Sequence, residues 1–216
     1  MTAFPKRDPL SLTSMYEDDE TANLTRTWAE AVVRQVSAVR AIRQKDAQQS
    51  RDYDRAEEWS GSEVELQQTY RERWAAEHTL IWAAYQLQRW TIRLAREIRD
   101  DHRRRRIAEA LDASEDPLLK DLRNALEHLD DAVLGDLHAS ADGTPATANR
   151  SLRRLPGQVV PRWIGGDKAF GLIDPDELQH RAEAVVSALD AESEAYTAYL
   201  IEEYLAQDHK PDDDVL

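Results

Sequence analysis

The chain has 216 residues, a formal net charge of −14 at pH 7, seven glycines, eight prolines and no cysteine. The length suits one domain with a full core, and the many Ala, Leu, Arg, Glu and Gln residues predict an all-α protein. The lack of cysteine excludes disulfides and thiolate metal sites. Since no apolar run reaches the ~18 residues of a membrane span, we expect a soluble cytoplasmic protein.

The negative charge is concentrated at the C-terminal end. Residues 174–216 carry 13 acidic and 2 basic side chains, a net of −11. Residues 1–173 carry the other 29 acidic and 26 basic side chains, a net of −3. Because phosphate attraction supplies most non-specific affinity for nucleic acid, this balance disfavours nucleic-acid binding except at a local basic surface.

The first half of the chain predicts a loose arm followed by two long helices. Residues 1–20 are polar and read as a flexible N-terminal arm. Apolar residues then recur at helical spacing over residues 21–48, and again over about 63–99 after a break at Ser60-Gly61-Ser62.

A third helix is predicted from Pro117 to about His138. Ser114-Glu115-Asp116 before Pro117 is typical of a helix start, because proline is tolerated in the first turn. A leucine stripe on one face of this helix is expected to pack against tryptophans of the two earlier helices. The stripe is Leu118, Leu122, Leu126, Leu129 and Val133, and the tryptophans are Trp28, Trp74 and Trp82.

The remainder predicts a long loop and a last helix. Residues 139–173 are rich in Gly, Pro, Ser and Thr, and short strands around residues 159–160 and 170–173 are not excluded. The last helix begins at Asp174-Pro175, and residues 209–216 form an acidic disordered tail. Residues 21–208 therefore predict a single up-and-down bundle of four to five long helices with one long Gly/Pro-containing loop.

One stretch of the third helix has the residue types of a catalytic site. Arg123 is followed directly by Asn124 and, after three more residues, by His128. Two other pairs have similar spacing: Arg73 with His78 and Arg96 with His102. Composition gives about two such pairs by chance, but only Arg123 is followed by an amide. On a helical wheel the motif faces away from the leucine stripe, so it is either a solvated face or a site that a second surface covers.

The Arg-Asn-x3-His pattern resembles the R-polar-x3-H motif of the HEPN superfamily (higher eukaryotes and prokaryotes nucleotide-binding), whose active members are metal-independent ribonucleases. The resemblance implies that RNA supplies its own 2'-hydroxyl nucleophile and that no cofactor is needed. His128 would transfer the proton, Arg123 would neutralise charge on the phosphate, and Asn124 would orient one of them.

The family also implies a homodimer that joins two motifs across one cleft, and a toxin or phage-defence effector with an antitoxin or other protein partner. Glu127, Asp130 and Asp131 surround His128 and would repel phosphate. The alternative is therefore a non-catalytic helical-bundle module for protein interaction or nucleotide binding.

Arginines elsewhere in the chain offer contacts to RNA. They are Arg93, Arg96 and Arg103 in a basic helix stripe that begins at Arg89, and Arg153 and Arg154 in the long loop beside Trp163. The alternatives are ion pairing of the stripe with the acidic last helix and packing of the loop tryptophan. Glu177-x-x-His180 is half of a di-iron pattern, but the chain lacks the second pair, so we expect no metal.

Overall fold

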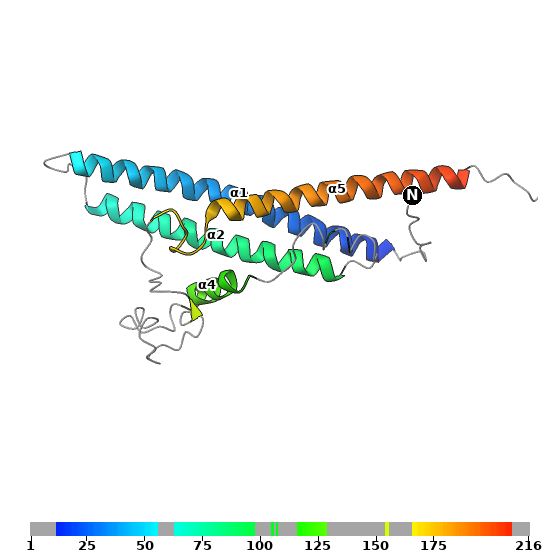
Figure 1. Ribbon diagram of the computed structural model, residues 1–216, viewed down its shortest axis with the longest axis horizontal. Coiled ribbons are helices and arrows are strands. Elements are labelled where there is room, and N and C mark those ends of the chain that lie inside the picture. The colour runs from blue at the N-terminus through cyan, green and yellow to red at the C-terminus, as the bar shows by residue number, and fades with distance from the viewer. Residues whose placement is uncertain are drawn as a thin grey trace, which may run out of the picture.

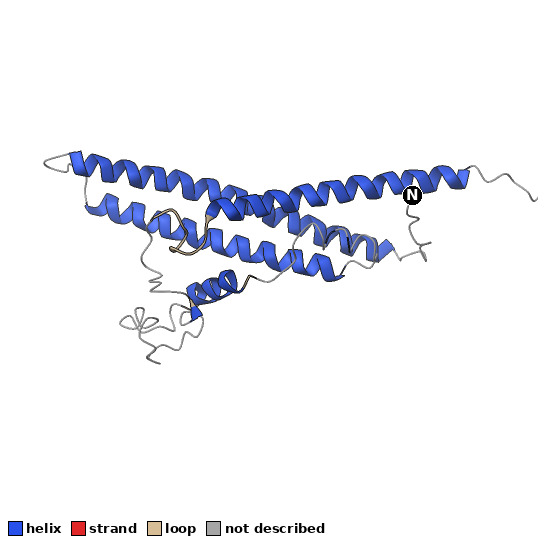
Figure 2. Cartoon of the chain, viewed as in Figure 1, coloured by secondary structure: helices blue, strands red, loops and turns tan. Residues whose placement is uncertain are grey.

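The computed structural model describes residues 12–55, 63–97, 105, 107, 116–128, 154–155 and 166–208. These residues are almost all helical (Figures 1 and 2). The helices are α1 (Leu12–Arg55), α2 (Glu63–Glu97), α4 (Pro117–Glu127) and α5 (Pro175–Asp208). Among the described residues the only β pairing is an isolated antiparallel bridge between Ala169 and Ile173. The predicted all-α helical bundle is confirmed.

The three long helices form an elongated body, and the short α4 lies on one side of it (Figure 1). α1 and α2 run antiparallel along most of their length, α5 crosses α1, and α4 packs against α2. With its 44 residues, α1 is about 66 Å long. None of the described helices has an apolar stretch long enough to cross a membrane.

The core lies where the apolar faces of the helices meet. α1 contributes residues spaced three and four apart, as a helix with one buried face must. These are Ala29, Val32, Val36 and Val39. From α2 the core receives Leu80, Ile81, Ala84, Leu87 and Leu94. α5 closes the other side with Leu178, Ala182, Val185 and Leu189. The apolar faces of these three helices therefore lie in one core.

The first helix is longer than predicted. It begins at Leu12, so residues 12–20, which we expected to belong to the flexible arm, are helical. The sequence from Ser11 to Arg55 contains neither glycine nor proline. Once the buried turns have nucleated the helix, each added residue gains a hydrogen bond and nothing in this stretch stops propagation.

α4 begins as predicted and ends earlier. The carboxylate of Asp116 caps its N-terminus by accepting from the backbone N–H of Leu118 at 2.9 Å and of Leu119 at 3.2 Å. The helix ends at Glu127 with His128 as its C-cap, instead of continuing to His138. Two members of the predicted stripe, Leu129 and Val133, lie outside the described residues.

The packing of α4 confirms part of the predicted stripe. Leu122 and Leu126 are buried, while Leu118 is only partly buried. α4 contacts α2, but among the described helices it does not contact α1. The predicted packing of the stripe against Trp28 of α1 stays a prediction, since the backbones of α1 and α4 do not approach each other.

A short irregular segment leads into α5. Gly166, Phe170 and Gly171 have positive φ angles of 72°, 50° and 71°, and Phe170 is buried. α5 then begins at Pro175, directly after Asp174, as predicted. Most of the predicted loop and the predicted tail at residues 209–216 lie outside the described residues.

Candidate functional site

Arg123 points toward α2, and not away from the core as the wheel predicted. Its guanidinium carbon lies 4.7 Å from the ring centre of Trp82 and 5.0 Å from that of Tyr85. The side chain of Arg123 is only 20% exposed. The wheel prediction is wrong for this residue because the long side chain reaches back from the edge of the buried face onto aromatic rings of α2.

The two terminal nitrogens of Arg123 are engaged by its own helix. Nη1 donates to Asn124 Oδ1 at 2.8 Å, and Nη2 forms an ion pair with Glu127 Oε2 at 2.5 Å. Nε is buried without a hydrogen-bond partner in the structure. We call Arg123, Asn124 and Glu127, with Trp82 and Tyr85, the Arg123 cluster. This cluster fastens α4 to α2.

The structure separates the third residue of the motif from the first. His128 is exposed at the C-cap of α4, and its backbone N–H donates to Asn124 O at 3.2 Å. Asn124 is half-buried. Of the three predicted catalytic residues, Arg123 and Asn124 are in direct contact, whereas His128 is presented to solvent.

A second histidine, His78 of α2, lies close to this end of α4. Its ring stacks on Trp74, with 5.1 Å between ring centres. Burial lowers the pKa of His78, and the negative charge of Glu127 acts on it in the opposite direction. Sequence reasoning missed His78 because its only signal, the Arg73 spacing, also arises by chance.

Arg73 belongs to a buried charge network on another face of α2. Glu77 is fully buried, and its Oε1 accepts from Arg43 Nη2 at 3.0 Å and from Arg73 Nε at 3.1 Å. Its Oε2 accepts the backbone N–H of Phe170 at 2.9 Å. Arg73 also pairs with Asp46 at 2.6 Å and donates to Gly166 O at 2.9 Å.

The charged side chains of this network are bound by one another and by backbone groups of the protein. Arg43 completes it by donating to the carbonyl of Asp167. The network therefore joins α1 and α2 to residues 166–170, and the carboxylate of Glu77 is fully buried within it. We interpret it as structural.

The predicted RNA-binding arginines are scattered. Arg89, Arg93 and Arg96 are exposed on α2, while Arg103 and Arg153 lie outside the described residues. Nη1 of the exposed Arg154 lies 3.6 Å from Oδ1 of the half-buried Asp121 of α4, in an ion pair. The guanidinium carbon of Arg93 lies 4.9 Å from the ring centre of Trp90.

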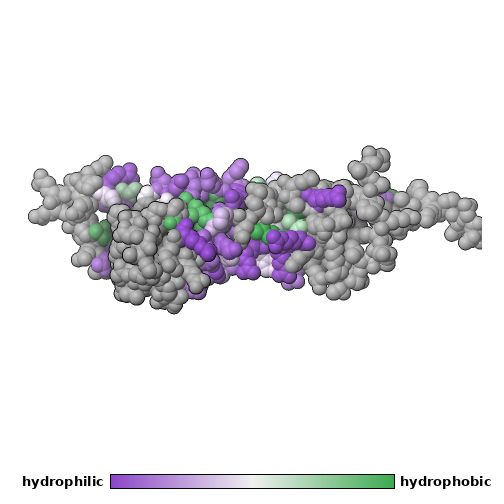
Figure 3. Space-filling view, turned by 60° about the horizontal axis from the view of Figure 1, so that its bottom comes forward, coloured by the Kyte–Doolittle hydropathy of each residue, from purple (hydrophilic) through white to green (hydrophobic). Residues whose placement is uncertain are grey.

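Polar and charged residues cover most of the described surface on the face drawn in Figure 3. Within the described part of the chain, no three His, Asp or Glu side chains are grouped as metal ligands. Glu177 and His180 are both exposed on α5.

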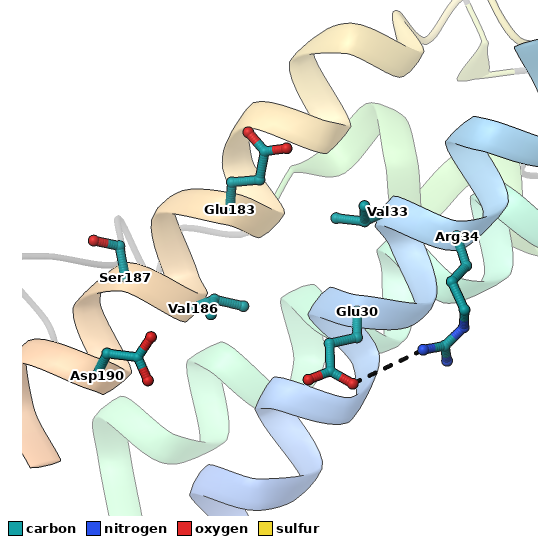
Figure 4. A pocket seen from close by; sticks show the side chains of 7 residues that line it. All are labelled: Glu30, Val33, Arg34, Glu183, Val186, Ser187 and Asp190. Carbon is teal, nitrogen blue, oxygen red and sulfur yellow. Dashed lines mark ion pairs between the residues drawn. The ribbon is translucent and has the colours of Figure 1, made fainter.

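A groove of about 580 Å³ lies between α1 and α5 (Figure 4). Glu30, Val33 and Arg34 line it from α1, and Glu183, Val186, Ser187 and Asp190 line it from α5. We call this the α1–α5 groove. The lining residues of the groove and the residues of the Arg123 cluster do not overlap.

Comparison of the chain with protein-family models, curated proteins and solved structures found no match.

Proposed function

We propose that this protein is a non-catalytic helical-bundle module that acts by binding a protein partner. The main support is that protein groups already surround the guanidinium of Arg123. Both terminal nitrogens of its guanidinium are engaged by Asn124 and Glu127, and the rings of Trp82 and Tyr85 lie against it. A phosphate would have to displace the carboxylate of Glu127 to reach this cation. The cluster is suited to holding two helices together rather than to binding RNA.

The charge of the surface supports a protein partner over RNA. α5 carries nine acidic residues and one basic residue. A field of this sign repels a polyphosphate and attracts a cationic protein surface. The α1–α5 groove combines this charge with apolar lining from Val33 and Val186.

The proposal is tested by a cleavage assay and a stability assay on the same preparations. Single-stranded RNAs of varied sequence are incubated with the protein in EDTA, and we expect no cleavage above that of buffer. Arg123→Ala should lower the stability, since the cluster is structural. Cleavage by the wild type that is abolished in His128→Ala would overturn the proposal.

A HEPN-like, metal-independent endoribonuclease is the second candidate, and the two histidines favour it. His128 is exposed at the end of α4, and the half-buried His78 lies close enough to Glu127 to respond to its charge. Metal-free transesterification requires a base for the 2'-hydroxyl and an acid for the leaving 5'-oxygen, and two imidazoles can supply them. The protein would then be a homodimeric toxin or phage-defence effector, with RNA as substrate and an antitoxin as a partner.

Three histidine variants separate the two candidates. If the second candidate holds, His128→Ala and His78→Ala both lose RNA cleavage in EDTA. His180→Ala is the matched control, because His180 is exposed on α5 and is not part of either site. Equal cleavage by all three variants would identify a contaminating nuclease and reject the second candidate.

A further inference from the structure

Two apolar side chains near the end of α5 lie on the side of the helix that turns away from the core. Ile201 and Leu205 are each 55% exposed. With 3.6 residues per turn, their positions lie about 150° around the helix axis from the residues that α5 buries. Those buried residues are Leu178, Ala182, Val185 and Leu189. The packing of the bundle therefore does not explain why this end of α5 is apolar.

Ile201 and Leu205 belong to a longer exposed face. Glu194 and Ala198 are exposed on the same side of α5, and the four residues follow one another at spacings of four, three and four. Glu202 is exposed beside Ile201. We call these five residues the outer face of α5. The spacing is that of a helix surface which packs against another helix.

The position of this face in the fold leaves room for a further helix. The C-terminal end of α5, drawn in red in Figure 1, extends past the described ends of α1 and α2. A partner helix could therefore lie along the last turns of α5 without displacing an element of the described bundle.

The charge of α5 selects the chemistry of the partner. Residues 191–208 carry five acidic side chains and no basic one. Glu194 and Glu202 place two of these charges next to Ile201 and Leu205. The α5 helix of a second copy would bring like charges together in this position, whereas a helix with lysine or arginine beside its apolar stripe would bring opposite ones.

We infer that the outer face of α5 binds a basic amphipathic helix of a protein partner. The inference rests on the proposed function, since it names the class of partner. The apolar stripe of the partner would cover Ile201 and Leu205, and its cations would lie against Glu194 and Glu202. RNA has the wrong charge for this face and lacks such a stripe.

The inference is tested with a synthetic peptide and the full chain. The probe is a fluorescein-labelled helix of leucine and lysine, about 18 residues long, with its leucines at helical spacing. A scrambled peptide of the same composition has no apolar face. In fluorescence anisotropy at about 0.15 M salt, the amphipathic peptide should bind with saturation and at least tenfold more tightly than the scrambled one.

Two double variants separate the apolar part of the face from its charge. Ile201→Ser with Leu205→Ser should raise the Kd of the peptide about tenfold. Leu66→Ser with Tyr70→Ser is the matched control, because these residues are the exposed apolar pair of α2; it should leave the Kd within about twofold. All four side chains are exposed, so the thermal melts should stay close to that of the wild type.

Glu194→Gln with Glu202→Gln should raise the Kd several-fold and make it less dependent on salt. Glu20→Gln with Glu177→Gln removes the same charge from exposed positions outside the face, and its effect should be smaller than half of that.

Three results would overturn the inference. They are equal binding of the two peptides, an unchanged Kd in the Ile201 and Leu205 variant, and a wild-type dimer that this variant converts to a monomer, which would assign the face to a second copy. The proposed function is judged separately by RNA cleavage in EDTA: a lack of peptide binding without cleavage rejects this inference alone, and cleavage that depends on His128 rejects the proposed function.

Discussion

The guanidinium of Arg123 lies over the indole of Trp82, with 4.7 Å between its central carbon and the ring centre. This contact joins the predicted catalytic helix to α2 through the residue that was expected to face solvent. Cation–π contacts of this kind contribute about 0.5–2 kcal/mol, and the partly buried ion pair with Glu127 adds to them.

We therefore expect Arg123→Ala to lower the free energy of unfolding by about 1–2 kcal/mol in urea melts. Arg71→Ala is the matched control, since Arg71 is exposed on α2; its effect should stay within about 0.5 kcal/mol. If Arg123→Ala melted with the wild type, Arg123 would not fasten α4, and the case against catalysis would lose its main support.

The packing of α4 is tested at Leu122, which is fully buried. Leu122→Ala removes side-chain volume from the contact with α2 and should cost about 2–5 kcal/mol. Leu66→Ala, on the exposed part of α2, should cost much less because Leu66 is 37% exposed. Equal effects of the two substitutions in urea melts would show that α4 contributes no stable core.

The buried network makes Glu77 the most sensitive charged residue of the described chain. Glu77→Ala leaves Arg43 and Arg73 without their shared carboxylate, and removal of one partner from a buried pair costs about 3–5 kcal/mol. Glu194→Ala, an exposed change on α5, is the control. Hydrogen exchange adds a local readout, because the amide of Phe170 loses its acceptor. Unchanged protection of that amide would contradict the assignment.

His78 gives the stability a pH dependence whose sign follows from its burial. Because the pKa of His78 is lower in the folded protein than its usual 6.5, the unfolded chain binds its proton first as the pH falls. The contribution of His78 to the free energy of unfolding is therefore full above about pH 6.5. It is lost as the pH falls toward the pKa of His78 in the folded protein. Urea midpoints between pH 7.5 and 5 should fall less steeply in His78→Gln than in the wild type. A folded-state titration of His78 above 6.5, measured by NMR, would refute this prediction.

The sequence was sufficient to predict the helices but not the direction of every side chain. The spacing of apolar residues predicted α2, α5 and the start of α4. This works because a helix that buries one face needs apolar residues three and four positions apart. For Arg123 the wheel gave only the direction of the Cβ atom. The position of a long side chain depends on what the neighbouring helix offers, here Trp82 and Tyr85.

Glu77 could not be identified from sequence for a related reason. A glutamate among apolar residues of a helix looks like a surface position, and only its partners explain its burial. Arg73 is a local partner four residues away, but the other two partners are 34 residues away at Arg43 and 93 residues away at Phe170. No local pattern encodes contacts at such separations, so this network, unlike the helices, required the structure.

The hydrogen bond from Phe170 to Glu77 also orders events during synthesis. α1 and α2 leave the ribosome first and can pair as a hairpin, but the backbone donor that completes the coordination of Glu77 arrives 93 residues later. Until then one carboxylate oxygen of the nascent hairpin depends on water. The segment from Gly166 to Ile173 thus acts as the final closure of the α1–α2 interface, and chains truncated before it should be kept from a native core even though both long helices are present.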